Sequence, residues 1–206
     1  MKGKSEVIEV LNEMLQEELC AINQYMIHAE MCENWGYKKL GRFIKKQSIG
    51  EMKHAEQLME RVLFLEGLPN VNNTLKVHVG KDVPQQIEND LALEKGAVSS
   101  YNRAIELCRK ASDNASADFL LVILKDEEEH VDFLETQLEI IKKIGIENYL
   151  TQQIELEGGK LRFGWRRHPG GVFSSTGPLA GAEAPGLPVE GRRPCGSFRN
   201  FRHPSA

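Results

Sequence analysis

The chain carries one pattern of ionisable residues twice, and this internal repeat constrains its fold more than any other feature. In each half, a glutamate stands 33 residues before the glutamate of a Glu-x-x-His motif. An offset of 76 residues superimposes the two sets, which are Glu18, Glu51 and His54 in the first half and Glu94, Glu127 and His130 in the second. The same offset relates Tyr25 to Tyr101. We therefore expect two halves of similar structure that contribute equally to one polar site.

Apolar residues recur at helical spacing in four long stretches, and no stretch alternates like a strand for more than a few residues. The expected helices cover about 5–34, 38–66, 82–111 and, after the residues 112–114, the chain up to 144, with a short fifth helix at about 147–157. Residues 67–81 form a long connection that opens with the stop signal Gly67-Leu68-Pro69. Short turns on either side of one long crossover predict an all-α, antiparallel four-helix bundle.

Composition changes near residue 157, which predicts a folded domain over residues 1–157 and a tail over residues 158–206. The tail holds 6 of the 8 prolines, 10 of the 18 glycines and eight basic against two acidic residues. Such a composition predicts a disordered segment without a packed core. Because the whole chain carries a net charge of −4, the first 157 residues carry about −10. An acidic body of this kind is not expected to bind nucleic acid.

Apolar runs and cysteine spacing in the sequence indicate the cellular compartment. There is no apolar run long enough to span a bilayer and no secretory signal at the N-terminus, so we expect no membrane association. The four cysteines show no Cys-x-x-Cys spacing, and three of them lie within expected helices. This pattern favours buried thiols in a reducing, cytoplasmic compartment.

The repeated residues predict a metal centre in the middle of the bundle. Residues three apart share a helix face, so each Glu-x-x-His motif directs a carboxylate and an imidazole to one point. Four buried carboxylates are costly unless cations neutralise them, and carboxylate with imidazole suits both Fe(II) and Fe(III). Taken singly, each glutamate would be an exposed helix residue and each histidine a packed or surface one. Together they match the di-iron arrangement of ferritin-like bundles. We predict two iron ions per chain, bound by Glu18, Glu51, His54, Glu94, Glu127 and His130.

With these residues in place, the chain over about residues 1–157 resembles the bacterioferritins. The stretches that carry the resemblance are residues 21–25 (AINQY), 51–56 (EMKHAE), 63–69 (LFLEGLP), 90–94 (DLALE), 126–130 (DEEEH) and 145–150 (GIENYL). The resemblance implies a hollow octahedral cage of identical subunits that stores ferric mineral. It also implies haem b shared between two subunits, with one methionine ligand from each, and Met52 occupies that position.

The resemblance also assigns roles within the iron site. Glu51 and Glu127 would bridge the two ions, and Tyr25 would donate an electron or a hydrogen bond. The remaining ligands, Glu18 and Glu94 with His54 and His130, would each hold a single ion. The best-studied members of the family carry a histidine and an aspartate as inner-surface iron ligands, where this chain has Lys46 and Gly50. The sequence therefore leaves open whether the chain has an additional iron site on the cavity wall.

The position of Met52 can be judged from helix geometry alone. It lies about 100° around the helix from Glu51, so it faces a different surface from the iron ligands. A stripe on the first helix, formed by Leu19, Ile22, Asn23 and Met26, is a candidate for the same subunit interface. Without the resemblance, Met52 would simply fill a gap in that interface; with it, haem ligation is favoured.

The predicted activity is oxidation of Fe(II) by dioxygen or peroxide, with a ferredoxin-type donor supplying electrons for iron release. Two other interpretations remain. One is a peroxide-scavenging di-iron protein of the rubrerythrin type, although these usually add a domain with paired Cys-x-x-Cys motifs, which this sequence lacks. The other is a helical scaffold without enzymatic activity, whose acidic residues face solvent.

Overall fold

The computed structural model describes residues 2–72 and 76–155, and within these ranges the secondary structure is entirely helical. There are four long helices and one short one: α1 (Ser5–Asn34), α2 (Lys38–Phe64), α3 (Val83–Lys110), α4 (Asn114–Ile144) and α5 (Ile146–Thr151). The predicted all-α four-helix bundle is therefore confirmed. The predictions made for residues 158–206 lie outside the described residues.

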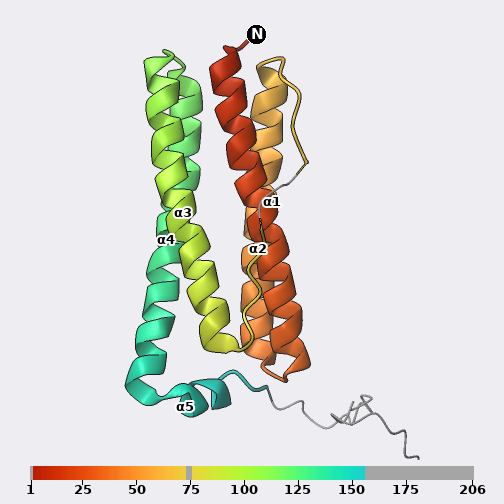
Figure 1. Cartoon of the computed structure of the whole chain (residues 1–206), viewed down its shortest axis with the longest axis vertical. Coiled ribbons are helices and arrows are strands. Elements are labelled where there is room, and N and C mark those ends of the chain that lie inside the picture. The colour runs from red at the N-terminus through yellow and green to blue at the C-terminus, as the bar shows by residue number, and fades with distance from the viewer. Residues whose placement is uncertain (1, 73–75, 156–206) are drawn as a thin grey trace, which may run out of the picture. The chain divides into compact units, whose positions relative to one another are not determined.

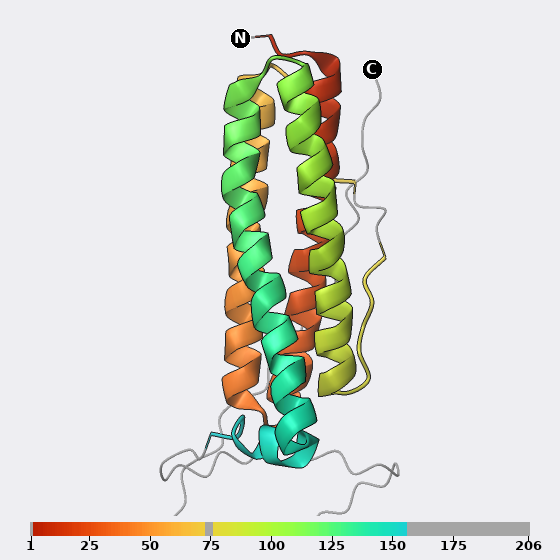
Figure 2. The ribbon, with the colours of Figure 1, turned by 90° about the vertical axis from the view of Figure 1, so that its left-hand side faces the viewer.

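The four long helices lie side by side; α1 and α4 run in one direction, and α2 and α3 run in the other (Figure 1). Helix α1 packs mainly against α2, and α3 packs mainly against α4, so each half of the sequence forms an antiparallel pair. The connection between α2 and α3 runs back along the length of the bundle (Figure 2). This single long crossover is what the spacing of the predicted helices requires.

Two helix ends differ from the sequence prediction. Helix α2 ends at Phe64, two residues before the expected Glu66. Helix α5 ends at Thr151 and does not continue toward Glu157. Here the chain turns away because the backbone carbonyl of Gln153 accepts a hydrogen bond from Lys39 N–H at 3.1 Å, and Glu155 pairs with Arg42. Contacts with the start of α2 therefore end the fifth helix.

Side-chain caps mark the starts of the two helices in the second half. Asp82 accepts a hydrogen bond from the backbone N–H of Gln85 at 2.9 Å, and a proline lies in the first turn of α3. Asp113 accepts a bond from Ser116 N–H at 3.0 Å and pairs with Arg61 of α2 at 3.1 Å. Each cap satisfies an N–H group that the helix leaves without a partner.

Buried polar side chains attach the crossover to the bundle. Asp90 of α3 lies 2.9 Å from Gln24 Nε2 and 2.9 Å from His28 Nδ1, both on α1. The other ends of these two side chains accept hydrogen bonds from the crossover backbone, Gln24 Oε1 from His78 N–H at 2.9 Å and His28 Nε2 from Gly80 N–H at 3.0 Å. A Cβ at Gly80 would lie 2.4 Å from a backbone nitrogen, so only glycine permits this approach.

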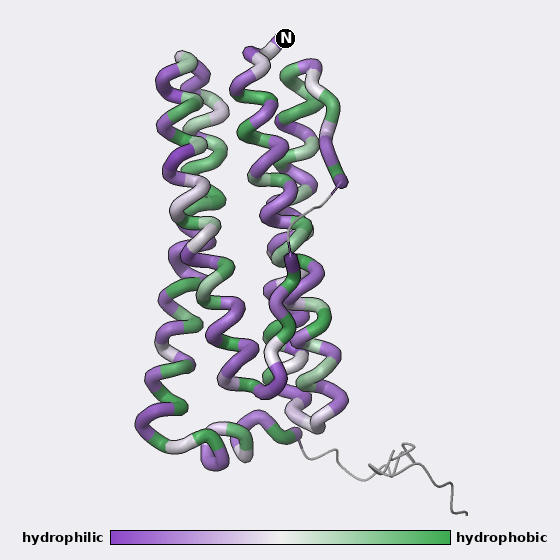
Figure 3. The backbone as a smooth tube through the Cα atoms, viewed as in Figure 1, coloured by the Kyte–Doolittle hydropathy of each residue, from purple (hydrophilic) through white to green (hydrophobic). Residues whose placement is uncertain are grey.

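Apolar and polar residues alternate along every long helix (Figure 3), as expected for amphipathic helices around one core. The buried apolar residues form two clusters. One cluster contains side chains from the first half of α1, between Val7 and Leu15, and side chains around Leu58 of α2, Ala104 of α3 and Leu120 of α4. The other contains side chains near Ala29, Ile44 and Leu134. On every long helix, the predicted iron ligands fall between the residues of the two clusters.

None of the helices in the described ranges is long and apolar enough to cross a membrane. Three cysteines within these ranges, Cys20, Cys32 and Cys108, are buried free thiols. Burial raises the pKa of Cys32 to about 12 and that of Cys108 to about 11, so both thiols are protonated at neutral pH. The cytoplasmic location inferred from the cysteine pattern stays a prediction.

Replacing Asp113 with alanine should lower the free energy of unfolding by about 1 kcal/mol, because α4 loses its cap. Asp113→Asn keeps a capping oxygen and should cost less. Burial raises the pKa of Asp113, but hydrogen bonds from Ser116 and the charge of Arg61 outweigh it and lower the pKa. The difference between the wild type and Asp113→Asn should therefore be present at neutral pH and disappear as the pH falls through the folded-state pKa, below about 3.9. Urea unfolding as a function of pH measures both effects.

Candidate metal centre

The structure brings all six predicted iron ligands together at one level of the bundle, between the two apolar clusters. Each long helix supplies one glutamate, and the second and fourth helices add a histidine each. The four glutamates are buried, with exposed fractions of 3% or less. The alternative of a scaffold with solvent-facing acidic residues disagrees with this burial.

The ligands form two overlapping groups of four. Glu18 and His54 complete one group, Glu94 and His130 complete the other, and Glu51 and Glu127 belong to both. Within each group, one ligand atom from every residue lies within 4.8 Å of the others. Two shared carboxylates, with one further glutamate and one histidine on either side, form the arrangement needed to hold two cations close together.

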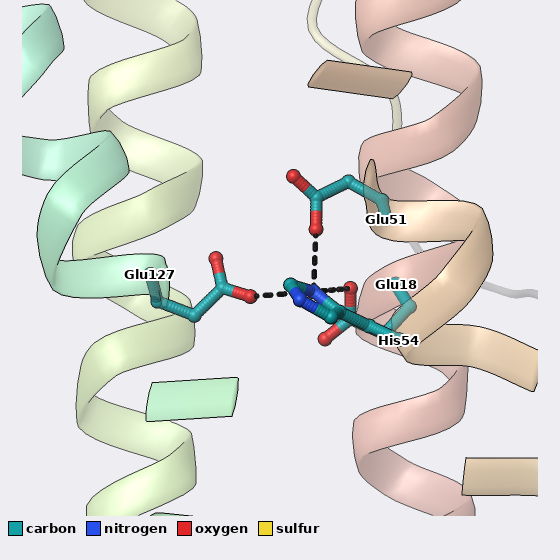
Figure 4. Close-up of side chains that lie close together, drawn as sticks. All are labelled: Glu18, Glu51, His54 and Glu127. Carbon is teal, nitrogen blue, oxygen red and sulfur yellow. Dashed lines mark hydrogen bonds and ion pairs between the residues drawn. The ribbon is translucent and has the colours of Figure 1, made fainter. Parts of the chain in front are cut away.

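His54 lies at the centre of the first group, with Glu51, Glu18 and Glu127 arranged around its ring (Figure 4). Its Nδ1 atom is 2.9 Å from Glu51, 3.2 Å from Glu127 and 3.6 Å from Glu18. The second group has similar geometry. His130 Nδ1 is 3.2 Å from Glu51, 3.4 Å from Glu127 and 3.7 Å from Glu94. The 76-residue repeat is therefore a symmetry of the site as well as of the sequence.

Three buried atoms of the site make no hydrogen bond, although each lies within ion-pair distance of another ligand. They are Oε1 of Glu51, Oε1 of Glu127 and Nδ1 of His130, and the described residues contain no other such side-chain atoms. A buried polar atom left unpaired costs free energy, and a bound cation removes that cost. All three atoms belong to the two ligand groups, so the residues present fit a pair of metal ions.

Burial and charge shift the acid–base behaviour of the site. Burial raises the pKa of Glu18 to about 8 and places the pKa of Glu94 well above its ordinary value. Burial also raises the pKa of the shared Glu127, but hydrogen bonds involving His130, His54 and Glu94 outweigh it and lower the pKa to about 2. Burial lowers the pKa of His54, yet its bonds with Glu127, Glu18 and Glu51 raise it far above the usual range. Without metal, protons therefore supply the positive charge.

Two buried tyrosines close the site, one from each apolar cluster. Tyr25 donates its hydroxyl hydrogen to Glu94, and Tyr101 donates its own to Glu18. Each therefore orients a terminal carboxylate of the opposite half. The sequence analysis named Tyr25 as a site residue and left Tyr101 out, although the 76-residue offset relating the two was already visible.

Met52, Lys46 and Gly50 all lie outside the ligand cluster. Met52 is 50% exposed on α2, on a different face from Glu51 and His54, as the helix geometry required. Ile49, Met59 and Leu63 line the same surface, together with the charged Lys53, Glu56 and Glu60. Lys46 is exposed, and Gly50 has no side chain to offer a ligand. A further carboxylate that the sequence analysis did not identify, Asp126, contacts His54 Nε2 at 3.2 Å.

Comparison with known proteins gives the family. The ferritin-like domain of the ferritin family matches residues 8–144. A bacterioferritin of Mycolicibacterium paratuberculosis is 43% identical over 152 residues, which cover 74% of this chain and 96% of the relative. The chain belongs to the bacterioferritin family. Bacterioferritins of Streptomyces coelicolor (44% identical over 75% of this chain and 93% of the relative) and Brucella melitensis (43%, over 72% and 92%) are similarly related.

Membership in the bacterioferritin family assigns the chain to iron storage. The matched region includes α1 from Ile8 onward, all of α2, α3 and α4, and all six predicted ligands. The metal centre thus lies in the part of the chain that defines a bacterioferritin.

Metal-free protein should bind two Zn(II) ions per chain, a redox-inert probe for the two groups. At pH 7, binding should release protons because Glu18, Glu94 and the histidines must lose theirs, and the affinity should fall as the pH is lowered. Bound metal should also raise the midpoint of thermal unfolding. Calorimetry in buffers of different ionisation enthalpy measures the stoichiometry and the protons released.

The shared ligands provide the sharpest variant for this measurement. Glu127→Ala should lower the affinity for both ions, whereas alanine at the adjacent exposed Glu128 should leave both affinities unchanged. If Glu127→Ala bound two ions with wild-type affinity, the shared-carboxylate arrangement would be contradicted.

Proposed function

We propose that the chain is a ferroxidase, which oxidises Fe(II) to Fe(III) and stores the ferric product inside a homo-oligomeric, haem-binding cage. The observation that carries this proposal is the sharing of Glu51 and Glu127 between two four-ligand groups. A storage protein that only bound iron would not need to hold two ions at short separation. Two adjacent ions can deliver two electrons to one oxidant molecule.

The substrates are two Fe(II) ions and one molecule of dioxygen or peroxide. With dioxygen, two Fe(II) and two protons give two Fe(III) and one hydrogen peroxide. With peroxide, two Fe(II) and two protons give two Fe(III) and two water molecules. In either case, each iron loses one electron, and the oxidant receives both. The oxidant that this chain prefers is part of the proposal to be tested.

The ligands suit a substrate that must bind, change oxidation state and leave. Carboxylate oxygens bind both Fe(II) and Fe(III), and one imidazole for each ion keeps the set mixed. The hydroxyl groups of Tyr25 and Tyr101 orient the terminal carboxylates Glu94 and Glu18. Tyr25 is in addition a candidate electron donor to the site. The two apolar clusters on either side limit the access of water to the ligand cluster.

Replacing Glu18 or Glu127 with alanine should lower the rate of Fe(II) oxidation by more than about tenfold, because each change removes a ligand. Stopped-flow absorbance of the ferric product measures the rate, with dioxygen and peroxide compared as oxidants. Alanine at the exposed Glu129 is the matched control and should leave the rate unchanged. Wild-type rates in Glu18→Ala and Glu127→Ala would refute the ferroxidase assignment.

Haem binding is supported by the surface around Met52. Its thioether is exposed beside apolar side chains on α2, and Leu19, Ile22 and Met26 of α1 are half-buried. A second copy of this surface, related by a two-fold axis, would supply the second methionine of a shared haem b. Bound haem supplies a one-electron redox centre, which provides a route for electrons from a ferredoxin-type donor when iron is released.

Met52→Leu should give protein that lacks haem and still oxidises Fe(II), because the thioether is a haem ligand and lies outside the iron site. Met59 lies on the same surface, so Met59→Leu is the control and should retain haem. The haem absorption spectrum together with the oxidation rate separates the two functions. Retained haem in Met52→Leu would rule out the ligand assignment.

The cage is supported by the exposed apolar residues on the long helices, which include Ile27, Ile49, Leu63 and Val122. Apolar side chains of this kind are commonly buried in subunit interfaces. Size-exclusion chromatography of the full chain, read by absorbance at the haem band, reports assembly and haem content together. A rubrerythrin-type protein would instead elute as a small oligomer without haem.

A further inference from the structure

The two halves of the metal centre match closely in their ligands, and this makes any difference between them informative. His54 Nδ1 and His130 Nδ1 lie 3.2 Å from the shared glutamate of the opposite motif, Glu127 and Glu51 respectively. Their distances to the terminal glutamates are 3.6 Å and 3.7 Å. The two tyrosines are also equivalent. The symmetry of residue types therefore extends through the ligands to the groups that orient the terminal carboxylates. The distance from Nδ1 to the glutamate of the same motif differs, at 2.9 Å for His54 and 3.4 Å for His130.

The symmetry ends at the outer nitrogen of the two imidazoles. Nε2 of His54 lies 3.2 Å from Oδ2 of Asp126, the residue directly before Glu127. When Nδ1 faces a cation, Nε2 carries the hydrogen and donates it to Asp126. A carboxylate at this position fixes the tautomer and orientation of a ligating histidine and increases the basicity of its ligand atom.

The 76-residue offset relates Asp126 to Gly50, the residue directly before Glu51. Glycine has no side chain that reaches His130. Among residues 2–72 and 76–155, the ion pairs of His130 are made through Nδ1, and its Nε2 makes no hydrogen bond or ion pair with a side chain. The His130 side chain is also more exposed than that of His54, 16% against 8%. His130 therefore lacks the support that His54 receives.

The surroundings of His130 leave its ring additional space. A cavity of about 20 Å³, room for about one water molecule, lies beside it and is lined also by Tyr25, Phe43, Gln47 and Phe133. An imidazole whose outer nitrogen has no orienting bond, and which lies next to a cavity, has more rotational freedom to lose when it binds a cation. That loss lowers the affinity of its position.

We propose that Asp126 is a positioning residue for His54 and that it makes the two metal positions unequal. The position of Glu18 and His54 binds a divalent cation first, and the position of Glu94 and His130 fills second. Asp126 acts through the imidazole and does not itself touch the cation. This inference rests on the proposed metal centre, and it adds an order of filling that the symmetric ligand set does not contain.

The test is a titration of metal-free, full-length protein with Co(II), followed by its absorption spectrum and by calorimetry. Wild-type protein should bind two Co(II) ions per chain in two resolved steps. His54→Ala should remove the tighter step and His130→Ala the weaker one, which assigns each step to a position.

Variants at Asp126 and Gly50 should both reduce the difference in affinity between the two steps, the first by weakening the tighter step and the second by strengthening the weaker one. Asp126→Ala should weaken the first step by about tenfold, the lower end for loss of an outer partner of a ligating histidine. Asp126→Asn keeps an acceptor oxygen and should restore part of the loss. Gly50→Asp should strengthen the second step, since it places a carboxylate at the position equivalent to Asp126, and a Cβ at Gly50 meets no atom within 4 Å. Gly50→Ala is the control and should leave two resolved steps.

The thermal midpoint of each metal-free variant distinguishes positioning from stability. Asp126 is about half exposed, so Asp126→Ala should unfold at the wild-type temperature while losing affinity for the first ion. Two Co(II) ions bound with equal affinity by the wild type, or a first step unchanged in Asp126→Ala, would overturn this inference and leave the ferroxidase proposal intact. Absence of Co(II) binding would instead refute the metal centre itself.

Discussion

Four carboxyl groups buried at one level of a helical core are the constraint on which the rest of this structure depends. Desolvation makes ionised glutamates costly in such a place, and the raised pKa of Glu18, about 8, reflects that cost. Protons on His54 and on the terminal glutamates offset part of it in the metal-free chain. Two divalent cations would offset it more completely, because they also satisfy the unpaired atoms of Glu51 and Glu127. Metal binding and folding are therefore coupled in this bundle.

The apolar packing is organised around this polar layer. Each long helix carries apolar residues on both sides of its ligand, so the core consists of two clusters with the site between them. Tyr25 belongs to one cluster and Tyr101 to the other, and each orients a carboxylate with its hydroxyl group. The crossover, anchored by Gln24 and His28, joins the two helix pairs without entering the site. Rigid packing on both sides restricts where the ligands can move.

The repeated halves explain which parts of the site are equivalent and which parts differ. An internal two-fold arrangement places equal ligand sets around two shared glutamates, which suits a reaction that takes one electron from each of two ions. Residues outside the ligand set do not have to be the same in the two halves. Asp126 and Gly50 occupy equivalent positions and differ in chemistry, so the two imidazoles have different surroundings. The proposed reaction needs equal ligand sets, and the proposed order of filling needs only this difference outside them.

The sequence by itself determined the fold class, the helix pairs and the six side chains that meet at the candidate metal centre, because helical periodicity and the 76-residue offset are properties of the chain itself. It also indicated Tyr101 through the same offset. Only the tertiary structure decided which side chains meet across helices. Asp126 lies beside His54 because α4 packs at one particular rotation and height against α2, and α5 ends at Thr151 because of contacts with α2. Such relations depend on the packing of distant segments, which local sequence patterns do not encode.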